Sequence, residues 1–286
     1  MRPTARSFVL DLLSTLKRGA MPVRALVAAG EGFGIAGNSV RVALARLLAA
    51  GRVERDERGR YRLGAGAEPV RRHAGSWRRL AERTRPWTGA WVGVATSGLP
   101  ARGTPATRRE RALRFLGLRA LEPGLAVRPD NLRGGVAAVR AELVALGLEA
   151  EAPVFELRGL DPATGARARA LWDVRALCAG YRRSLADLER SARRLPRLAE
   201  PEAMAESFLL GGRVIRQLVL DPLLPEAIVP AGEREALVHA MRRYDRLGRA
   251  CWSAFLDRYD VPHLRAPADT RIPDGAERLA LAGGAP

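Results

Sequence analysis

The chain has 286 residues, of which 47% are hydrophobic, and carries a formal net charge of +17 at pH 7. This length leaves room for two or three domains of about 100 to 200 residues each. No apolar run approaches the roughly 20 residues that cross a bilayer, and no signal peptide is recognisable, so we expect a cytoplasmic protein with no membrane partner. The two cysteines, Cys178 and Cys251, lie far apart, which argues against a disulfide framework and a cysteine-rich zinc site.

Positive charge is concentrated at the N-terminal end. Residues 1–85 contain 18 basic and 7 acidic residues, whereas residues 86–286 contain 30 and 24. All but one of the basic residues are arginines, and GC-rich coding accounts for part of this bias. Counterion release supplies most of the non-specific affinity for DNA, so the local excess favours a polyanionic partner, without separating DNA from RNA or a membrane surface.

Two short helices are predicted near the N-terminus. Thr4 or Ser7 opens the first, because both residue types cap helices. This helix carries an apolar stripe made of Val9, Leu12, Leu13 and Leu16. Pro22 opens the second helix, since proline suits the first helical turn, and Leu26 and Val27 then point to the core.

The segment from Gly34 to Leu63 predicts a third helix followed by a β-hairpin. The apolar face of the helix consists of Val40, Leu44, Leu47 and Leu48, at spacings of i, i+4, i+7 and i+8. After Gly51, apolar and charged residues alternate on both sides of a turn at residues 56–59, as a hairpin requires. Three helices and an arginine-rich hairpin are the make-up of a winged helix-turn-helix that docks on DNA, which we assign to residues 1–66.

The exposed side of the third helix and the hairpin supply the candidate DNA contacts. These are Asn38, Ser39, Arg41, Val42, Arg46, Arg55, Arg58 and Arg60. Arg46 is placed to reach the major groove, where arginine pairs with guanine O6 and N7. Asn38 and Ser39 either contact a base edge or phosphate, or Asn38 caps the helix and Ser39 faces solvent. Arg41 makes either a phosphate contact or an internal ion pair, and the hairpin arginines either contact the backbone and minor groove or belong to a solvated hairpin.

Residues 67–85 are predicted to form a linker that continues into an arginine-rich helix. Over residues 86–168 strands and helices then alternate. The predicted elements are a strand at 91–96, a basic helix around 109–118, a strand at 125–128, a helix at 136–146 and a strand at 155–157. This order predicts a ferredoxin-like central domain.

Residues 169–286 are predicted to be mainly helical. Two apolar seams repeat at steps of three and four residues, and they consist of Leu171, Val174, Cys178, Tyr181, Leu185 and Leu188, and of Leu237, Met241, Tyr244, Leu247, Cys251 and Phe255. A proline-rich connection at 221–230 separates them, and the last twenty or so residues are predicted to be a loose tail. We therefore expect an α+β protein with a winged helix-turn-helix, a ferredoxin-like centre and a helical C-terminal domain.

This order of parts resembles the PaaX family, repressors of phenylacetic acid degradation and their relatives. The matching segments are NSVRVALARL, GRYRL, WTGAWVGV, LRFLGLRALEPGLAVRPDNL, ALWDVRALCAGYRRSLADL and VLDPLLPEAIVP. The resemblance implies a transcriptional repressor of an aromatic-acid or related catabolic operon, with a homodimer formed by the C-terminal domain. It also implies release from DNA by phenylacetyl-CoA or a related CoA thioester.

Enzymatic activity is the first rival interpretation. The central fold that the resemblance implies is shared with CRISPR proteins that place a metal-binding aspartate at the end of the first strand, but the strand WVGVATSG contains no acidic residue. A hydrolase built on Cys178 or Cys251 with His239 or His263 is disfavoured because both cysteines lie on apolar seams and no GxSxG motif is present. These histidines and His73 lack metal-ligand spacing. We therefore expect no enzyme, no metal and no cofactor.

A constitutive, effector-independent nucleic-acid-binding protein is the second rival. An effector pocket between the central and C-terminal domains is the alternative, since ligand sites favour domain interfaces. Trp172 and Tyr181 either line such a pocket, with Arg182 and Arg183 facing CoA phosphates, or belong to the core, with the arginines in solvent. The effector-binding residues therefore stay unassigned. A two-fold dimer would read a palindromic operator in double-stranded DNA.

Overall fold

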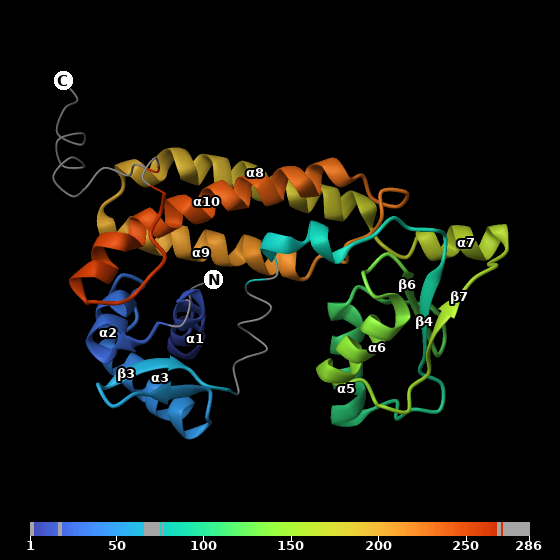
Figure 1. Ribbon diagram of the computed structural model, residues 1–286, viewed down its shortest axis with the longest axis horizontal. Helices are drawn as coiled ribbons and strands as arrows, with labels where there is room; N and C mark the ends of the chain where they lie inside the picture. The colour runs from blue at the N-terminus through green and yellow to red at the C-terminus, as the bar shows by residue number, and fades with distance from the viewer. Residues whose placement is uncertain (1–2, 17–18, 66–74, 76, 268–269, 271–286) are drawn as a thin grey trace. The chain divides into compact units, whose positions relative to one another are not determined.

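The computed structural model describes residues 3–16, 19–65, 75, 77–267 and 270. It combines helices with two small antiparallel sheets, which confirms the α+β class (Figure 1). The chain divides into two compact units: the first contains residues 1–78, 183–219 and 237–286, and the second contains residues 79–182 and 220–236. The expected division into consecutive domains at residues 66, 85 and 168 stays a prediction. No helix among the described residues has the length and apolar character needed to cross a membrane.

The N-terminal part of the first unit contains the predicted helices and hairpin. Its elements are α1 (Ala5–Thr15), β1 (Met21–Pro22), α2 (Val23–Glu31), α3 (Gly37–Ala49), β2 (Val53–Arg55) and β3 (Arg60–Leu63). Thr4 begins α1, because its side-chain oxygen accepts a hydrogen bond from the backbone N–H of Ser7 at 3.2 Å. Pro22 is the N-cap of α2. The strands form an antiparallel sheet in the order β1-β3-β2, so the hairpin is confirmed, and β1 is an addition that its two-residue length hides in the sequence.

The buried face of α3 differs from the predicted face at one edge. Val40, Leu44 and Leu47 are buried, as predicted, but Leu48 is 40% exposed and Ala43 is buried in its place. At about 100° per residue, Ala43 and Leu48 lie on opposite edges of the apolar face. The core side therefore accepts the small side chain, and Leu48 joins the exposed side of the helix.

An aromatic cluster joins the N-terminal helices to α9 (Glu200–Val219) and α10 (Ala231–Arg258) within the first unit. The ring centroid of Phe33 lies 4.8 Å from that of Phe8 and 5.3 Å from that of Phe208. Trp252 of α10 lies 5.9 Å from Phe208 by the same measure, and its indole N–H donates to the carbonyl of Met204. The segment between α2 and α3 is therefore held directly against the long helices.

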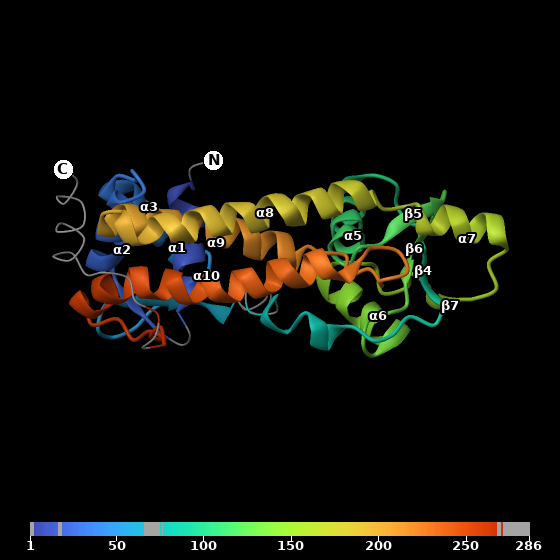
Figure 2. The ribbon, with the colours of Figure 1, turned by 90° about the horizontal axis from the view of Figure 1, so that it is seen from above.

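The long helices of this unit also hydrogen-bond to one another. Residues 183–194 of α8 (Val174–Arg194) lie beside α9 and α10, as both ribbon views show (Figure 1, Figure 2). Ser191 of α8 lies 2.7 Å from the hydroxyl of Tyr244, and Ser184 donates to the Gln217 amide oxygen at 2.5 Å. A short 3-10 turn, η4 (Leu195–Arg197), connects α8 to α9. Five of the six residues of the second predicted seam are buried, and three of the six residues of the first, while α9 is an additional helix.

The second unit contains a four-stranded antiparallel sheet. Its elements are η3 (Ala81–Arg83), β4 (Trp91–Ala95), α5 (Gly103–Phe115), β5 (Arg119–Glu122), β6 (Leu125–Pro129), α6 (Gly135–Leu146), β7 (Val154–Leu157) and α7 (Pro162–Arg169), followed by the start of α8. The strand order is β5-β6-β4-β7, which is the β-α-β-β-α-β arrangement of a ferredoxin-like sheet. α5 and α6 pack against each other beside the sheet. The predicted strands and helices are all present, and β5 is an addition.

The linker helix predicted for residues 67–85 is corrected over its described part. Residues 77–83 form two 3-10 turns, η2 (Trp77–Arg79) and η3, instead of an α-helix. Beyond them the backbone pairs with another strand-like segment, because Arg85 N–H donates to Asn131 O at 2.8 Å and Arg133 N–H donates to Arg83 O at 2.9 Å. This extended pairing around Thr84 ends the helical turns. Residues 66–74, which include the start of the predicted linker and His73, lie outside the described part, as does most of the predicted tail.

Candidate nucleic-acid interface

The outward side of α3 presents a set of polar side chains around one apolar residue. All five helix residues of the candidate set are exposed: Asn38, Ser39, Arg41, Val42 and Arg46. Val42 is 41% exposed, although the other valine of the helix, Val40, is fully buried. Arg41 forms no ion pair with another described residue, and its two alternatives, a phosphate contact and an internal ion pair, stay predictions. The helix therefore offers guanidinium groups, short polar groups and one methyl-bearing side chain on a free surface.

The start of α3 lacks a side-chain cap. The N-cap is Ala36, and α3 begins at Gly37, so Asn38 is the second helical residue and the alternative in which Asn38 caps the helix is excluded. The first backbone N–H groups of an α-helix have no partner inside the helix, and alanine has no side-chain oxygen that accepts from them. Together with the helix dipole, these N–H groups favour an anion at this end of α3. The sequence analysis missed this uncapped helix start. Its signal in the sequence is Ala36, an apolar residue at the position where a capping side chain is expected.

The hairpin keeps two arginines in solvent. The carboxylate of Asp56 accepts from the backbone N–H groups of Arg58 and Arg60, at 3.0 and 2.8 Å, and Gly59 takes φ +74°, which together set the tight turn. Arg58 is exposed at the tip. The exposed Arg55 lies with its guanidinium carbon 6.0 Å from the centre of the Tyr61 ring. Both side chains are therefore available to a partner beside α3.

The remaining hairpin arginines already have partners. Arg60 donates to the backbone oxygen of Asp260, just beyond α10, at 3.0 Å. Arg62 makes two hydrogen bonds of 3.1 Å to Glu54, so its charge is neutralised locally. Arg60 thus links the hairpin to the end of α10, a contact between residues 200 positions apart that the sequence does not signal.

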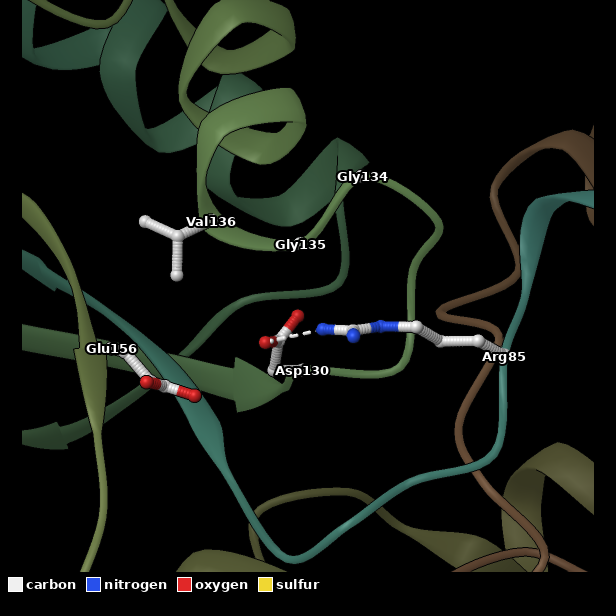
Figure 3. A pocket seen from close by; sticks show the side chains of 6 residues that line it. All are labelled: Arg85, Asp130, Gly134, Gly135, Val136 and Glu156. Atoms are coloured by element: carbon white, nitrogen blue, oxygen red, sulfur yellow. Dashed lines mark hydrogen bonds and ion pairs between the residues drawn. The ribbon is translucent and has the colours of Figure 1, made fainter.

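An open cavity of about 480 Å³ lies in the second unit, beside the start of α6 (Figure 3). Its lining residues are Arg85, Asp130, Gly134, Gly135, Val136 and Glu156. Asp130 is 5% exposed, and its Oδ2 accepts from Arg85 at 2.6 Å, while its Oδ1 has no hydrogen-bond partner among the described residues. Glu156 is paired with Arg158 at 2.7 Å. The cavity therefore mixes charges of both signs and does not favour an anion.

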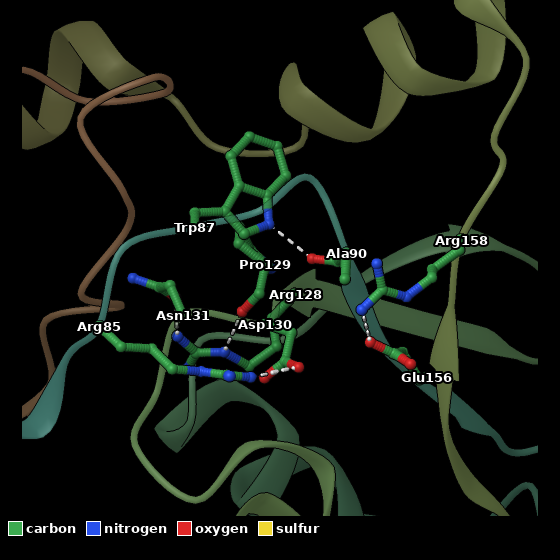
Figure 4. A network of polar contacts seen from close by, with 9 residues as sticks. All are labelled: Arg85, Trp87, Ala90, Arg128, Pro129, Asp130, Asn131, Glu156 and Arg158. Atoms are coloured by element: carbon green, nitrogen blue, oxygen red, sulfur yellow. Dashed lines mark hydrogen bonds and ion pairs between the residues drawn. The ribbon is translucent and has the colours of Figure 1, made fainter.

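Beneath this cavity a buried guanidinium organises a polar network (Figure 4). Arg128 is 2% exposed and donates to Pro129 O at 3.2 Å, to the Leu116 carbonyl, to Asn131 Oδ1 at 3.0 Å and to Pro222 O at 3.2 Å. Asn131 in turn donates to Leu223 O at 2.6 Å. Burial is the main cause that lowers the pKa of Arg128 to about 10, which still leaves it charged at neutral pH. Segments 128–131 and 222–223 are thereby fixed together.

Tyr181 also holds the segment that begins at Asp221. Its hydroxyl donates to Asp221 at 2.5 Å, and burial raises the pKa of both groups. Tyr181 is 2% exposed and Trp172 is 5% exposed, with the Trp172 ring stacked 6.3 Å from Trp91. These two aromatic residues therefore belong to the core, as one of the two sequence interpretations has it. Arg182 is exposed and pairs with Glu233.

The groups considered for catalysis are placed as packing residues. Cys178 and Cys251 are buried, and burial, followed by Glu233, raises the pKa of the Cys178 thiol, which keeps it protonated. The Nδ1–H of His263 donates to Val261 O at 2.9 Å, and its Nε2 lies 3.1 Å from Ser253 Oγ. Among the described residues no three His, Cys, Asp or Glu side chains gather as metal ligands would.

Comparisons with known proteins support the sequence resemblance. The profile of the family described as PaaX-like protein matches residues 4–67, so this segment is similar to that family. Members of that family are generally transcriptional regulators, not enzymes. A solved structure, of the uncharacterized protein Rv0674 from Mycobacterium tuberculosis, is similar at 25% sequence identity and a TM-score of 0.56, covering 84% of this chain and 97% of that one. No functionally curated protein matches the chain.

Proposed function

Because residues 4–67 match the profile of the PaaX-like family, we propose that this protein is a transcriptional regulator that binds double-stranded DNA sequence-specifically through α3 and the hairpin. The observation that carries the proposal is the outward face of α3. It combines the exposed Arg46, Asn38 and Ser39 with an uncapped helix start, and the solvent-exposed arginines of the hairpin lie in the same domain.

Each side chain has a role in this proposal. Arg46 reads guanine in the major groove, and Val42 makes an apolar contact with a thymine methyl group. The start of α3, with Asn38 and Ser39, receives a backbone phosphate or a base edge, since phosphate contacts fix the register of a protein on the duplex. Arg41 contacts phosphate on the flank of the helix.

The hairpin arginines contribute unequally to binding. Arg55 and Arg58 contact phosphate or the minor groove, as their exposure allows. Arg60 does so in exchange for its bond to Asp260, so DNA and the end of α10 compete for one guanidinium. This competition gives the helices of the first unit a direct influence on the hairpin.

The finer parts of the proposal follow the resemblance to the PaaX family. We infer a cytoplasmic homodimer that represses an aromatic-acid or related catabolic operon from a palindromic operator. Phenylacetyl-CoA or a related thioester releases the DNA by preferring a dimer in which the two α3 helices no longer match the half-sites. An effector-independent basic protein that binds any duplex is the alternative function.

Fluorescence anisotropy distinguishes these functions. The purified protein is titrated into labelled DNA from upstream of its own gene and into a scrambled duplex of equal length, at about 150 mM salt, because +17 net charge makes any duplex bind at low ionic strength. Tighter binding to the native DNA supports the regulator, and its release by phenylacetyl-CoA supports the effector. Equal affinity for both duplexes favours the unspecific binder.

A further inference from the structure

The cavity beside the start of α6 has the size of a small-molecule site. Its volume of about 480 Å³ falls within the range of about 300 to 1,000 Å³ that such sites occupy. All of its lining residues belong to the second unit. Figure 3 shows the carboxylates of Asp130 and Glu156 on facing sides of this space, while Arg85 reaches Asp130 from the far side. The cavity therefore sets two acids and a base around a space that a compact molecule fills.

One oxygen of the Asp130 carboxylate lacks a hydrogen-bond donor. The residue is 5% exposed, and its Oδ2 accepts from Arg85 at 2.6 Å, whereas its Oδ1 has no partner among the described residues. Burial of a charged group is costly unless its hydrogen bonds are satisfied. The terminal torsion of aspartate is broad, so a small rotation of the carboxylate presents Oδ1 to the cavity. An ammonium group of a ligand supplies the strongest hydrogen bond to such an oxygen.

The start of α6 supplies the opposite preference next to this carboxylate. The N-cap is Gly134, at φ +81°, so the helix begins without a capping side chain. Its first backbone N–H groups have no partner inside the helix, Asp130 Oδ1 accepts none of them, and together with the helix dipole they favour an anion. A Cβ atom at Gly135 would lie 3.6 Å from each carboxylate oxygen of Asp130. One small molecule can therefore reach the acid and the helix start together.

The charged side chains around the cavity balance one another. The hydrogen bond from Arg158 is the main cause that lowers the pKa of Glu156, and the charge of Arg85 adds to this effect. Glu156 is likewise the main cause that raises the pKa of Arg158, and Asp130 adds to that rise. Each arginine therefore interacts with both carboxylates, and the four side chains together carry no net charge. A ligand with a single charge would unbalance this arrangement, whereas a zwitterion would not.

We propose that this cavity binds a small zwitterion, an α-amino acid, with its ammonium group between Asp130 and Glu156 and its carboxylate at the first N–H groups of α6. An α-amino acid carries both charged groups on one carbon, which matches the short separation of Asp130 from the helix start. The guanidinium of Arg85 has N–H groups left to donate to the ligand carboxylate. The apolar part of the ligand contacts Val136, which also lines the cavity. The inference is independent of the proposed function, because it concerns a separate site in the second unit.

Isothermal titration calorimetry with the full-length protein tests the site. Each of the twenty common α-amino acids is titrated, and the tightest is then compared with two analogues, one that lacks its carboxylate and one that lacks its amino group. These analogues show whether both charges are recognised. An amine that binds as tightly as the amino acid would overturn the zwitterion.

Two variants remove one charge each from the site while keeping its shape, Glu156→Gln and Asp130→Asn. Glu156 is the safer position for folding, because its side chain is 40% exposed. The matched control is Glu122→Gln. Glu122 lies on β5, the other edge strand of the same sheet, and pairs with Arg167 at 2.7 Å, as Glu156 pairs with Arg158 at 2.7 Å. Circular dichroism verifies that the three variants fold.

We expect at least one amino acid to bind with a Kd below about 1 mM. Glu156→Gln should weaken this binding about tenfold or more, because a hydrogen bond to a charged group typically contributes such a factor, and Glu122→Gln should leave the affinity unchanged. Each analogue that lacks a charge should also bind about tenfold more weakly or worse. The absence of any amino acid that binds below about 1 mM, or equal effects of Glu156→Gln and Glu122→Gln, would overturn the inference.

Discussion

The aromatic cluster allows a quantitative prediction of how strongly the N-terminal helices are held against the long helices. Phe33 is 8% exposed, and its ring meets Phe208 of α9 nearly edge-on, with centroids 5.3 Å apart and an interplanar angle of 79°. Replacing a buried phenylalanine by alanine costs about 3–5 kcal/mol, through lost burial and the cavity left behind. An edge-to-face ring pair contributes about 0.5–1.5 kcal/mol beyond burial. Phe33→Ala should therefore lower the free energy of unfolding by about 3–5 kcal/mol.

A double-mutant cycle isolates the ring contact. Unfolding free energies of wild type, Phe33→Ala, Phe208→Ala and the double variant are measured by urea titration with tryptophan fluorescence, which Trp252 reports from inside the cluster. The coupling energy should be about 0.5–1.5 kcal/mol. Phe33→Leu, which keeps most of the apolar volume but not the ring, should lose less stability and show less coupling to Phe208→Ala. Additive losses within about 0.3 kcal/mol would refute a direct contact between α9 and the segment before α3.

Three further predictions concern the polar groups. Arg128→Met should lower the free energy of unfolding, measured in urea, by about 2–4 kcal/mol, because four buried acceptors lose their donor. The control variant of an exposed arginine, Arg158→Met, should leave this free energy unchanged, and equal effects of the two variants would contradict the network. Burial raises the folded-state pKa of Asp221 above its ordinary 3.8, so the folded protein binds this proton more tightly than the unfolded chain does. Relative to Asp221→Asn, the wild type should therefore lose stability as the pH rises from about 3.8 through the raised pKa, and a stability difference that does not change with pH would contradict the shift. Arg58→Ala should reduce the slope of log K for DNA binding against log salt by about 1, and Arg62→Ala should reduce it by less, because Glu54 already neutralises Arg62. The reverse order in anisotropy titrations would contradict the proposed hairpin contacts.

Local patterns predicted the N-terminal helices and hairpin well. The spacing of Val40, Leu44 and Leu47 is a property of the helix itself, and the turn at 56–59 depends on adjacent residues. The N-cap alternative for Asn38 and the error at Leu48 also arise locally. A good capping residue can sit inside a helix when the chain enters earlier, and a small residue such as Ala43 can face the core while a larger one faces solvent.

The missed elements have weaker patterns. β5 pairs only with β6 at the edge of the sheet, and its residues Arg119–Glu122 are half polar, so no apolar alternation marks it. Two adjacent glycines interrupt the apolar pattern of α9, although Gly211 is buried beside Met241 and Tyr244 of α10.

The contacts that organise the second unit could not be predicted from local patterns. Asn131 and Leu223 hydrogen-bond across 92 residues of sequence, and Arg128 finds its acceptors on three separate segments. A buried arginine inside a strand reads as an exposed residue until its carbonyl partners are placed.

The most direct test of DNA recognition by α3 is the specificity ratio of Arg46→Ala, measured by anisotropy on native and scrambled duplexes at about 150 mM salt. A bidentate arginine–guanine pair is worth about 1–3 kcal/mol of discrimination, so the ratio of the two affinities should fall by roughly 5- to 150-fold. Binding to scrambled DNA should weaken only slightly. Equal losses on both duplexes would show that Arg46 contacts the backbone alone, and the assignment of α3 as the helix that reads the sequence would be wrong.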